Sequence, residues 1–148
     1  MNKSVKLSDL FPLIKEQLDA GGVASFPIHG KSMMPMLRDR IDSVRIAKPD
    51  SNPQKYDIIF YTREDGSFIL HRIVGIKNGI YICRGDNQIQ NELVNEKQVI
   101  AYVTEYTKNG KWKKIDSVTQ KIYSRFWVNT VIFRWLTKKA ISFFRRLF

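Results

Sequence analysis

Hydrophobic and polar positions follow a helical spacing at both ends of the chain and a strand spacing between them. From Ser8, a candidate N-cap, to about Ala20, apolar residues recur three or four positions apart, and two glycines follow. The middle of the chain alternates instead, in runs rich in β-branched and aromatic residues. From about Tyr123 to Phe148 the helical spacing returns. The pattern therefore predicts a β body with a helix at each end.

Five runs in the middle region are predicted strands, and a further strand is expected around Trp112 to Val118. The sequences "EDGS" and "KNG", which flank the third run, predict hairpins. In the second of them, Asn78 and Gly79 tolerate the positive φ of a tight turn. The five runs cover residues 43–47, 56–62, 67–76, 80–84 and 99–106.

The length of 148 residues is enough for one domain with its own hydrophobic core. We expect residues 1–120 to form a mainly β domain and residues 121–148 to form a basic amphipathic helix. A hydrophobic fraction of 43% with 26% charged residues is typical of a folded globular protein. The single cysteine, Cys83, excludes an intramolecular disulfide and a zinc site built on cysteines.

The first residues do not have the pattern of a targeting or anchoring segment. Lys15, Glu16 and Asp19 interrupt their apolar positions, so no uncharged run is long enough for a signal or a span. We therefore expect no secretory signal and no spanning helix here, and a chain that starts on the cytoplasmic side.

The net charge of +11 predicts an anionic partner or surface, and much of the surplus lies after Lys108. There the cations alternate with large apolar residues, which is typical of a helix lying on a membrane. The longest uncharged run is about eight residues, far fewer than the roughly 20 that a span needs. One face of the predicted helix holds Phe126, Ile132, Phe133, Leu136, Ala140, Phe143, Phe144 and Leu147, and cations lie on its flanks.

We therefore expect residues 123–148 to associate peripherally with an anionic membrane surface, on the cytoplasmic side rather than the other. Nucleic acid is not the expected partner. In the alternative interpretation, the aromatic face of this helix packs on the β domain as part of its core.

Ser32 is the candidate nucleophile, within "HGKSMMPML" at residues 29 to 37. A serine hydroxyl attacks a carbonyl only when a base takes its proton and nearby donors hold the oxyanion. The backbone N–H of Ser32 is one such donor if Gly30 allows a close approach. The alternative is that Ser32 is an ordinary loop residue.

The residues after the serine are expected to form an apolar substrate pocket. Met33 and Met34 are flexible and apolar, and Pro35 fixes the backbone just beyond them. The pocket they line would hold small aliphatic side chains.

Two histidines, His29 and His71, are candidate bases at neutral pH. His71 stands inside the apolar strand "FILHRIVG", where a polar side chain requires a partner. His29 lies only three residues before the serine, and we expect it to be exposed. His71 is therefore the preferred base, although a histidine in a strand is more commonly structural.

These motifs together resemble the signal peptidase I family of serine peptidases. "GKSMMPML" is similar to the nucleophile motif of that family, and "DIIFY", "ILHRIVGI" and "YICRGDN" follow in its order and spacing. The resemblance covers roughly residues 24 to 104. It implies the coiled β-barrel fold that signal peptidases share with the self-cleaving SOS repressors, with a short N-terminal helix and a C-terminal amphipathic helix added.

The resemblance also implies site residues. With a histidine at position 71 the chain resembles the histidine branch of the family, since the other branch has lysine there. Ser32 would be the nucleophile, His71 the general base and then acid, and Asp86 of "RGDN" the group that orients the imidazole. The backbone at Gly30 and Ser32 would hold the oxyanion. In the alternative interpretation, Asp86 is a turn residue.

The function expected from these residues is a serine endopeptidase that cleaves a leader or signal segment from a peptide or preprotein at a membrane surface. No cofactor and no metal is expected. One alternative is a self-cleaving repressor-type peptidase, which would use a lysine base and a DNA-binding module. The other is a non-catalytic basic β domain that binds lipid or nucleic acid.

Overall fold

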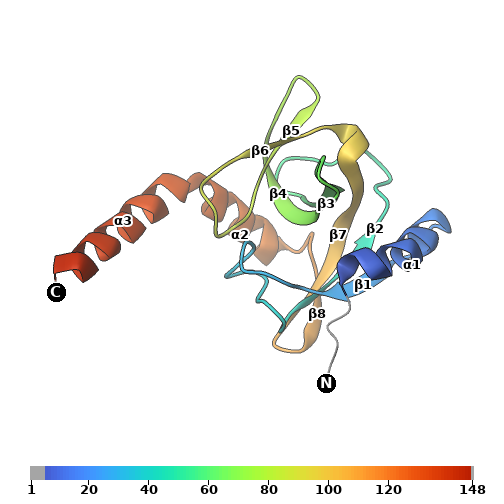
Figure 1. Cartoon of the computed structure of the whole chain (residues 1–148), viewed down its shortest axis with the longest axis horizontal. Coiled ribbons are helices and arrows are strands. Elements are labelled where there is room, and N and C mark those ends of the chain that lie inside the picture. The colour runs from blue at the N-terminus through green and yellow to red at the C-terminus, as the bar shows by residue number, and fades with distance from the viewer. Residues whose placement is uncertain (1–5, 148) are drawn as a thin grey trace.

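The computed structural model describes residues 6–147, which form one antiparallel sheet of eight strands and three α-helices (Figure 1). The fold is mixed α and β, and not the mainly β fold that was expected, because the strands do not strongly dominate over the helices. The helices are α1 (Leu7–Asp19), α2 (Val118–Asn129) and α3 (Val131–Leu147), and a short 3-10 turn, η1, spans Glu96–Gln98. The strands are β1 (Ala24–Pro27), β2 (Ser43–Ala47), β3 (Ile58–Thr62), β4 (Phe68–Lys77), β5 (Ile80–Arg84), β6 (Glu92–Val94), β7 (Val99–Lys108) and β8 (Lys111–Lys114).

The sheet is curled but open. Its strands follow the order β1, β2, β7, β3, β4, β5, β6, and β8 pairs with β7. Within residues 6–147, the end strands β1 and β6 do not pair with each other, so the closed barrel expected from the sequence is not formed. Figure 1 shows the strands wrapping around a common centre, with α1 at one side and α3 extending away at the other.

Strand β7 connects the two halves of the sheet through both of its edges. Tyr102 pairs with Ala47 of β2 and with Ile59 of β3, so those two strands lie on opposite edges. Glu105 pairs with Arg45 of β2 and with a residue of β8, so β8 is also opposite β2. Strands β3 and β8 therefore follow one another along the same edge of β7.

Strand β3 is buried on both faces, which explains its continuous apolar sequence. Ile58 and Phe60 point into a larger core beneath α1, whereas Ile59 and Tyr61 point into a smaller core on the opposite face. The larger core includes Leu18, Phe26, Met33, Leu37, Val44, Ile46 and Val103, and the smaller one includes Ile73, Tyr81, Cys83 and Val94.

Helix α1 agrees closely with the predicted N-terminal helix. It buries Ile14 and Leu18 against the larger core, and Gly21, with φ of 76°, follows its end. Ser8 lies inside the helix, and the N-cap position is taken by Lys6, which makes no side-chain capping bond. The proposed N-cap was therefore wrong, although the helix was predicted correctly.

The five predicted strands are present, and the short strands β1 and β6, of four and three residues, were not predicted. The strand expected at residues 112–118 ends earlier, at Lys114. The reason is the N-cap of the next helix, since the Ser117 hydroxyl accepts a hydrogen bond from the Gln120 N–H. This bond starts α2 within the segment expected to be extended.

The C-terminal segment forms two helices rather than the single one expected. Helix α2 lies on the body and buries Gln120, Ser124 and Val128, whereas α3 buries none of its side chains and projects from the body (Figure 1). The interpretation in which the aromatic face joins the core therefore does not hold for α3. No helix in residues 6–147 has the length and apolar character required to cross a membrane.

The two-sided burial of β3 predicts the cost of truncating neighbouring residues. Ile58→Ala and Ile59→Ala should each lower the free energy of unfolding by about 2–5 kcal/mol, because each leaves a cavity in a different core. Ile76, which is 44% exposed in β4, provides the matched control, and Ile76→Ala should cost less than about 1 kcal/mol. Urea denaturation measures all three, and a near-neutral result at either residue of β3 would contradict its burial on that face.

Candidate active site

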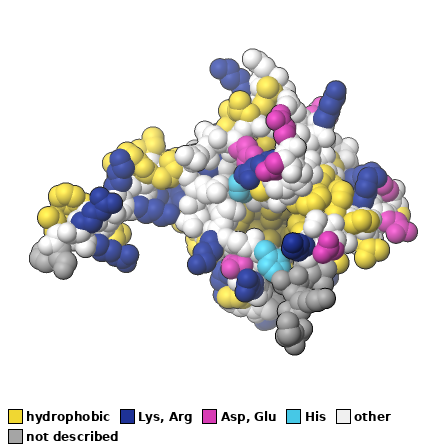
Figure 2. Space-filling model, viewed as in Figure 1, with side chains coloured by type: hydrophobic (Ala, Val, Ile, Leu, Met, Phe, Trp, Pro, Cys, Tyr) yellow, Lys and Arg dark blue, Asp and Glu magenta, His cyan; other side chains and the backbone are white. Residues whose placement is uncertain are grey.

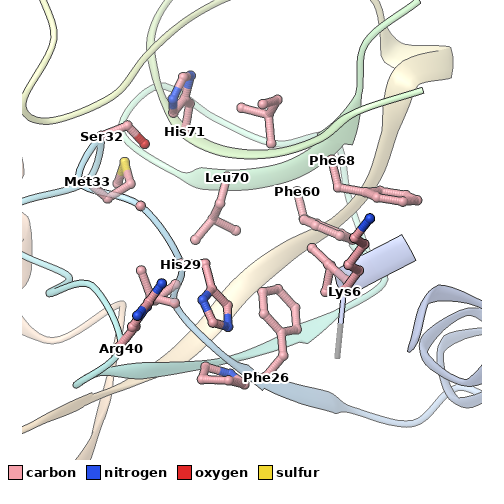
Figure 3. A pocket seen from close by; sticks show the side chains of 15 residues that line it. Lys6, Phe26, His29, Ser32, Met33, Arg40, Phe60, Phe68, Leu70 and His71 are labelled. Carbon is pink, nitrogen blue, oxygen red and sulfur yellow. The ribbon is translucent and has the colours of Figure 1, made fainter. Parts of the chain in front are cut away.

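A pocket of about 410 Å³ opens between β1 with the segment after it and strands β3 and β4. Its walls are largely apolar and include Phe26, Phe60 and Leu70 (Figure 3). Figure 2 shows a hollow with hydrophobic side chains on this face of the body, with histidine side chains beside it. The chain therefore forms one apolar recess large enough to hold side chains of a peptide.

Ser32 and His71, which are far apart in the sequence, both line this pocket. Figure 3 shows them at the same end of it, with the serine on the segment after β1 and the histidine on β4. Within residues 6–147 no hydrogen bond joins the hydroxyl to the imidazole. Catalytic hydrogen bonds are often long before substrate binds, so this geometry is compatible with proton transfer in a complex.

The imidazole of His71 is buried and uncharged at neutral pH. Only 4% of the residue is exposed, and this burial lowers the pKa of His71 to about 4. The carboxylate of Glu92 acts in the opposite direction and raises the pKa, but by less than burial lowers it. A neutral imidazole has a free lone pair, which is the requirement for a general base.

The partners of the imidazole are Tyr61 and Glu92, and neither was among the site residues predicted from the sequence. The Tyr61 hydroxyl lies 3.2 Å from His71 Nδ1 and donates a hydrogen bond of 2.7 Å to Glu92 Oε2. Arg63 donates to both oxygens of the same carboxylate, at 2.5 and 2.9 Å. A buried imidazole is thus connected to an ionised carboxylate through one tyrosine.

One of these partners had a signal in the sequence. The hairpin at residues 64–67 sets a register in which Ile59 pairs with His71, so Tyr61, two residues further, lies on the same face as His71. Glu92 had no such signal, because it belongs to β6, a strand of three residues that is too short to show a period.

Asp86 does not orient the imidazole as the resemblance implied. Its two oxygens accept hydrogen bonds from Arg72 Nε and Nη2, both at 2.8 Å, and one also accepts from Tyr123 at 3.1 Å. Arg72 follows His71 in β4, and successive side chains of a strand point to opposite faces. Asp86 therefore lies on the arginine side of the strand, and its position corrects the expected triad.

The "GDN" sequence instead holds the serine segment in place. The N–H of Asn87 donates to the Ser32 carbonyl at 2.8 Å, and the Asn87 side chain donates to the Lys31 carbonyl at 3.2 Å. Gly85 allows this approach, since a Cβ there would lie only 2.6 Å from the same Ser32 carbonyl oxygen. The turn after β5 thus holds the segment of Ser32, the candidate nucleophile, and not the His71 imidazole.

Both C-terminal helices hold this turn from the other side. Trp127 of α2 and Arg134 of α3 donate to the Asp86 carbonyl, at 2.7 and 2.9 Å. Lys138 of α3 donates to the side-chain oxygen of Asn87 at 2.8 Å. The C-terminal segment is therefore connected by hydrogen bonds to the residue that binds the Ser32 carbonyl.

The two expected oxyanion donors are placed differently. Gly30, with φ of 94°, donates its N–H to the Asp39 carboxylate at 2.8 Å, so this N–H is already engaged. In the described part of the chain, no protein group accepts a hydrogen bond from the Ser32 N–H. Ser32 therefore remains the candidate backbone donor to an oxyanion. Gly30 contributes the positive φ of the backbone just before the serine.

Only one of the expected pocket residues lines the pocket. Met33 lies in its wall, whereas the lining does not include Met34 or Pro35. Met36 is buried in the larger core, which also holds part of Met33. His29, the other candidate base, also lines the pocket and is exposed, as the sequence predicted.

Comparisons with known proteins do not add an assignment. A scan against models of protein families and a search of curated proteins both find no match to this sequence. In residues 6–147, no group of three or more His, Cys, Asp or Glu side chains is arranged to hold a metal ion. The resemblance to the signal peptidase I family therefore rests on the short motifs of the sequence.

The close approach at Gly85 predicts a specific effect of a methyl group. Gly85→Ala places a Cβ against backbone that cannot yield cheaply, and should lower the free energy of unfolding by about 1–3 kcal/mol. It should also shift the amide resonances of Ser32 and Asn87, because their hydrogen bond must lengthen. NMR spectra and urea denaturation measure both effects.

Gly75→Ala is the matched control, because a Cβ at Gly75 would lie 3.4 Å from the flexible end of Ile82. It should leave the resonances of the serine segment in place. A Gly85→Ala protein with unchanged resonances at Ser32 would contradict the role of this glycine in positioning Ser32.

Proposed function

We propose that the protein is a serine endopeptidase of signal-peptidase type, in which Ser32 is the nucleophile and His71 the general base. The observation that supports this most strongly is that both residues line one end of a single apolar pocket (Figure 3). Neither local sequence nor hairpin pairing brings them to the same pocket, so their shared position at one end of it is a property of the folded chain.

The proposed reaction follows from the groups present. The lone pair of a neutral His71 takes the Ser32 proton as the hydroxyl attacks the carbonyl of a peptide bond. The Ser32 N–H donates to the oxyanion that forms. The protonated imidazole then gives its proton to the leaving amine, and water releases the acyl group by the reverse steps.

A lysine base of the repressor type is less well supported. Lys6 is the lysine among the residues that line the pocket, and Figure 3 shows it at the end away from Ser32. Lys108 donates to the carbonyl groups of Pro35 and Met36, both at 2.9 Å. These contacts favour His71 as the base.

Cleavage of a proteome-derived peptide library, with new termini identified by mass spectrometry, tests the proposal. Ser32→Ala and His71→Ala should each reduce cleavage by roughly 10²-fold or more, because each removes a group that acts in the transition state. Ser25→Ala, at an exposed serine of β1, is the matched control and should retain the rate. Equal cleavage by the His71→Ala protein would exclude the proposed base.

The rate should depend on pH through the imidazole. Activity requires the neutral ring, so kcat/KM should fall as the pH decreases through about 4, the pKa of His71, and not near the 6.5 of an ordinary histidine. The unfolded chain already binds this proton below pH 6.5, whereas the folded chain binds it only near pH 4. The free energy of unfolding therefore also decreases as the pH falls from 6.5 to about 4. Circular dichroism at each pH separates the two effects.

We also infer that α3 binds an anionic membrane surface. The helix has five Lys and Arg residues and no acidic residue. Anionic lipid attracts each nearby cation by about 1 kcal/mol. Seven large apolar side chains of α3 are 53–71% exposed, namely Ile132, Phe133, Leu136, Ile141, Phe143, Phe144 and Leu147. Figure 2 shows hydrophobic and cationic groups side by side along the projecting helix.

The outer turn of α3 allows a test that leaves the body intact. Replacing Phe143 and Phe144 together by serine should weaken co-sedimentation with phosphatidylglycerol vesicles by about tenfold or more, because apolar area is no longer buried in the interface. Ile41→Ser is the matched control, since Ile41 is 66% exposed on the body. Unchanged binding of the double variant, or equal binding to phosphatidylcholine vesicles, would contradict the inference.

A further inference from the structure

We propose that Tyr61 and Glu92 fix the tautomer of His71, so that Nδ1 carries the proton and Nε2 is the basic nitrogen. This inference deepens the proposed function, on which its catalytic meaning rests. It assigns to a tyrosine and a glutamate, from β3 and β6, the positioning role that the resemblance gave to Asp86.

The assignment follows from counting donors and acceptors. An ionised carboxylate only accepts hydrogen bonds, so the contact of 2.7 Å between Tyr61 and Glu92 Oε2 requires the tyrosine to donate. A hydroxyl has one proton, and Tyr61 therefore has only lone pairs to offer His71. The contact of 3.2 Å at Nδ1 is then a hydrogen bond in which the imidazole donates.

The Glu92 carboxylate, at the end of this row of hydrogen bonds, is itself held in place. Arg63 donates to both oxygens of Glu92 in a paired arrangement, and this contact holds the pKa of Glu92 below its usual value. Pairing of Glu92 with Cys83 in the sheet sets the position of its backbone. Because Glu92 stays ionised, Tyr61 keeps its orientation.

The opposite tautomer would not support the proposed chemistry. If Tyr61 donated to Nδ1, the imidazole proton would lie on Nε2, which could not accept the proton of Ser32. Nε2 has no hydrogen-bond partner within residues 6–147, so it is the nitrogen that remains for the substrate side. Fixing the tautomer thus selects the nitrogen that can act as a base.

The charged groups around the ring are compatible with this role. Glu92 and Asp86 favour the imidazolium, and Arg63 opposes it. Glu92 is connected to the ring through Tyr61, and its carboxylate lies 3.8 Å from Nδ1, so it stabilises the imidazolium formed during the reaction. Asp86 acts only from a distance, since its oxygens are held by Arg72 and Tyr123.

Imidazole ¹⁵N shifts in the whole protein read the tautomer directly. The chain has two histidines, so a His29→Gln spectrum assigns the signals of His71. We expect a protonated Nδ1 and an unprotonated Nε2 at pH 7. In Glu92→Ala, the Tyr61 hydroxyl loses its acceptor and turns to Nδ1, so the proton should move to Nε2.

Three further variants separate this role from a structural one. Glu92→Gln retains an acceptor for Tyr61 and should keep the Nδ1–H tautomer. Tyr61→Phe removes the acceptor of Nδ1 and should lose the fixed tautomer. Asp86→Asn should lose stability yet keep the tautomer, because Asp86 does not contact the ring. A protonated Nε2 in the wild-type protein, or an Nδ1–H that persists in both Glu92→Ala and Tyr61→Phe, would overturn the proposal.

Kinetic measurements on the same variants distinguish this inference from the proposed function. With a peptide cleaved by the wild-type protein, Glu92→Ala should lower kcat by roughly 10²- to 10⁴-fold, with KM changed by less than about threefold. Glu92→Gln should recover most of the rate. Absence of Ser32-dependent cleavage would defeat the peptidase proposal and leave the tautomer result standing, whereas a wrong tautomer in an active protein would defeat this inference alone.

Discussion

The buried ion pair between Arg72 and Asp86 is the interaction on which the rest of the structure depends. Arg72 is completely buried, and its guanidinium also donates to the Tyr56 carbonyl at 3.0 Å and to the Ser124 hydroxyl at 2.8 Å. One side chain therefore joins β4, the turn after β5, the segment before β3 and helix α2. Loss of either partner would leave a buried charge unpaired, which typically costs about 3–5 kcal/mol. The turn that binds the Ser32 carbonyl is held by this pair.

Alternation along β4 explains how neighbouring residues serve different purposes. His71 lies at one end of the pocket and contacts Tyr61 beside Glu92, while Arg72 contacts the turn and α2. The proposed base and the main structural charge are thus adjacent in sequence but separated by the strand. This separation keeps the imidazole out of contact with the guanidinium, and leaves burial as the largest influence on its pKa.

The proposals for the pocket and for the C-terminal helix concern connected parts of the molecule. Arg134 and Lys138 of α3 contact Asp86 and Asn87, and Asn87 donates to Ser32. A lipid surface that bound the outer part of α3 would therefore hold the body close by, with the serine segment connected to α3 through the hydrogen bonds of Asp86 and Asn87. Such an arrangement suits a substrate that is itself anchored near a membrane.

The sequence by itself determined the elements with a clear period, namely α1, the five longer strands and the amphipathic character of the C-terminal segment. It also indicated Ser32 and His71 as candidates, because a serine and a histidine in those contexts are chemically distinctive, and the structure has both residues line one pocket. The tertiary structure alone decided that the sheet stays open, that the C-terminal segment divides into two helices, and that Glu92 rather than Asp86 lies beside Tyr61 and the imidazole. The physical reason is the distance along the sequence over which each feature is set. Periodicity within an element shows which of its faces is buried, whereas the partner of a buried polar group depends on strands that are far apart in the sequence and pair in the fold.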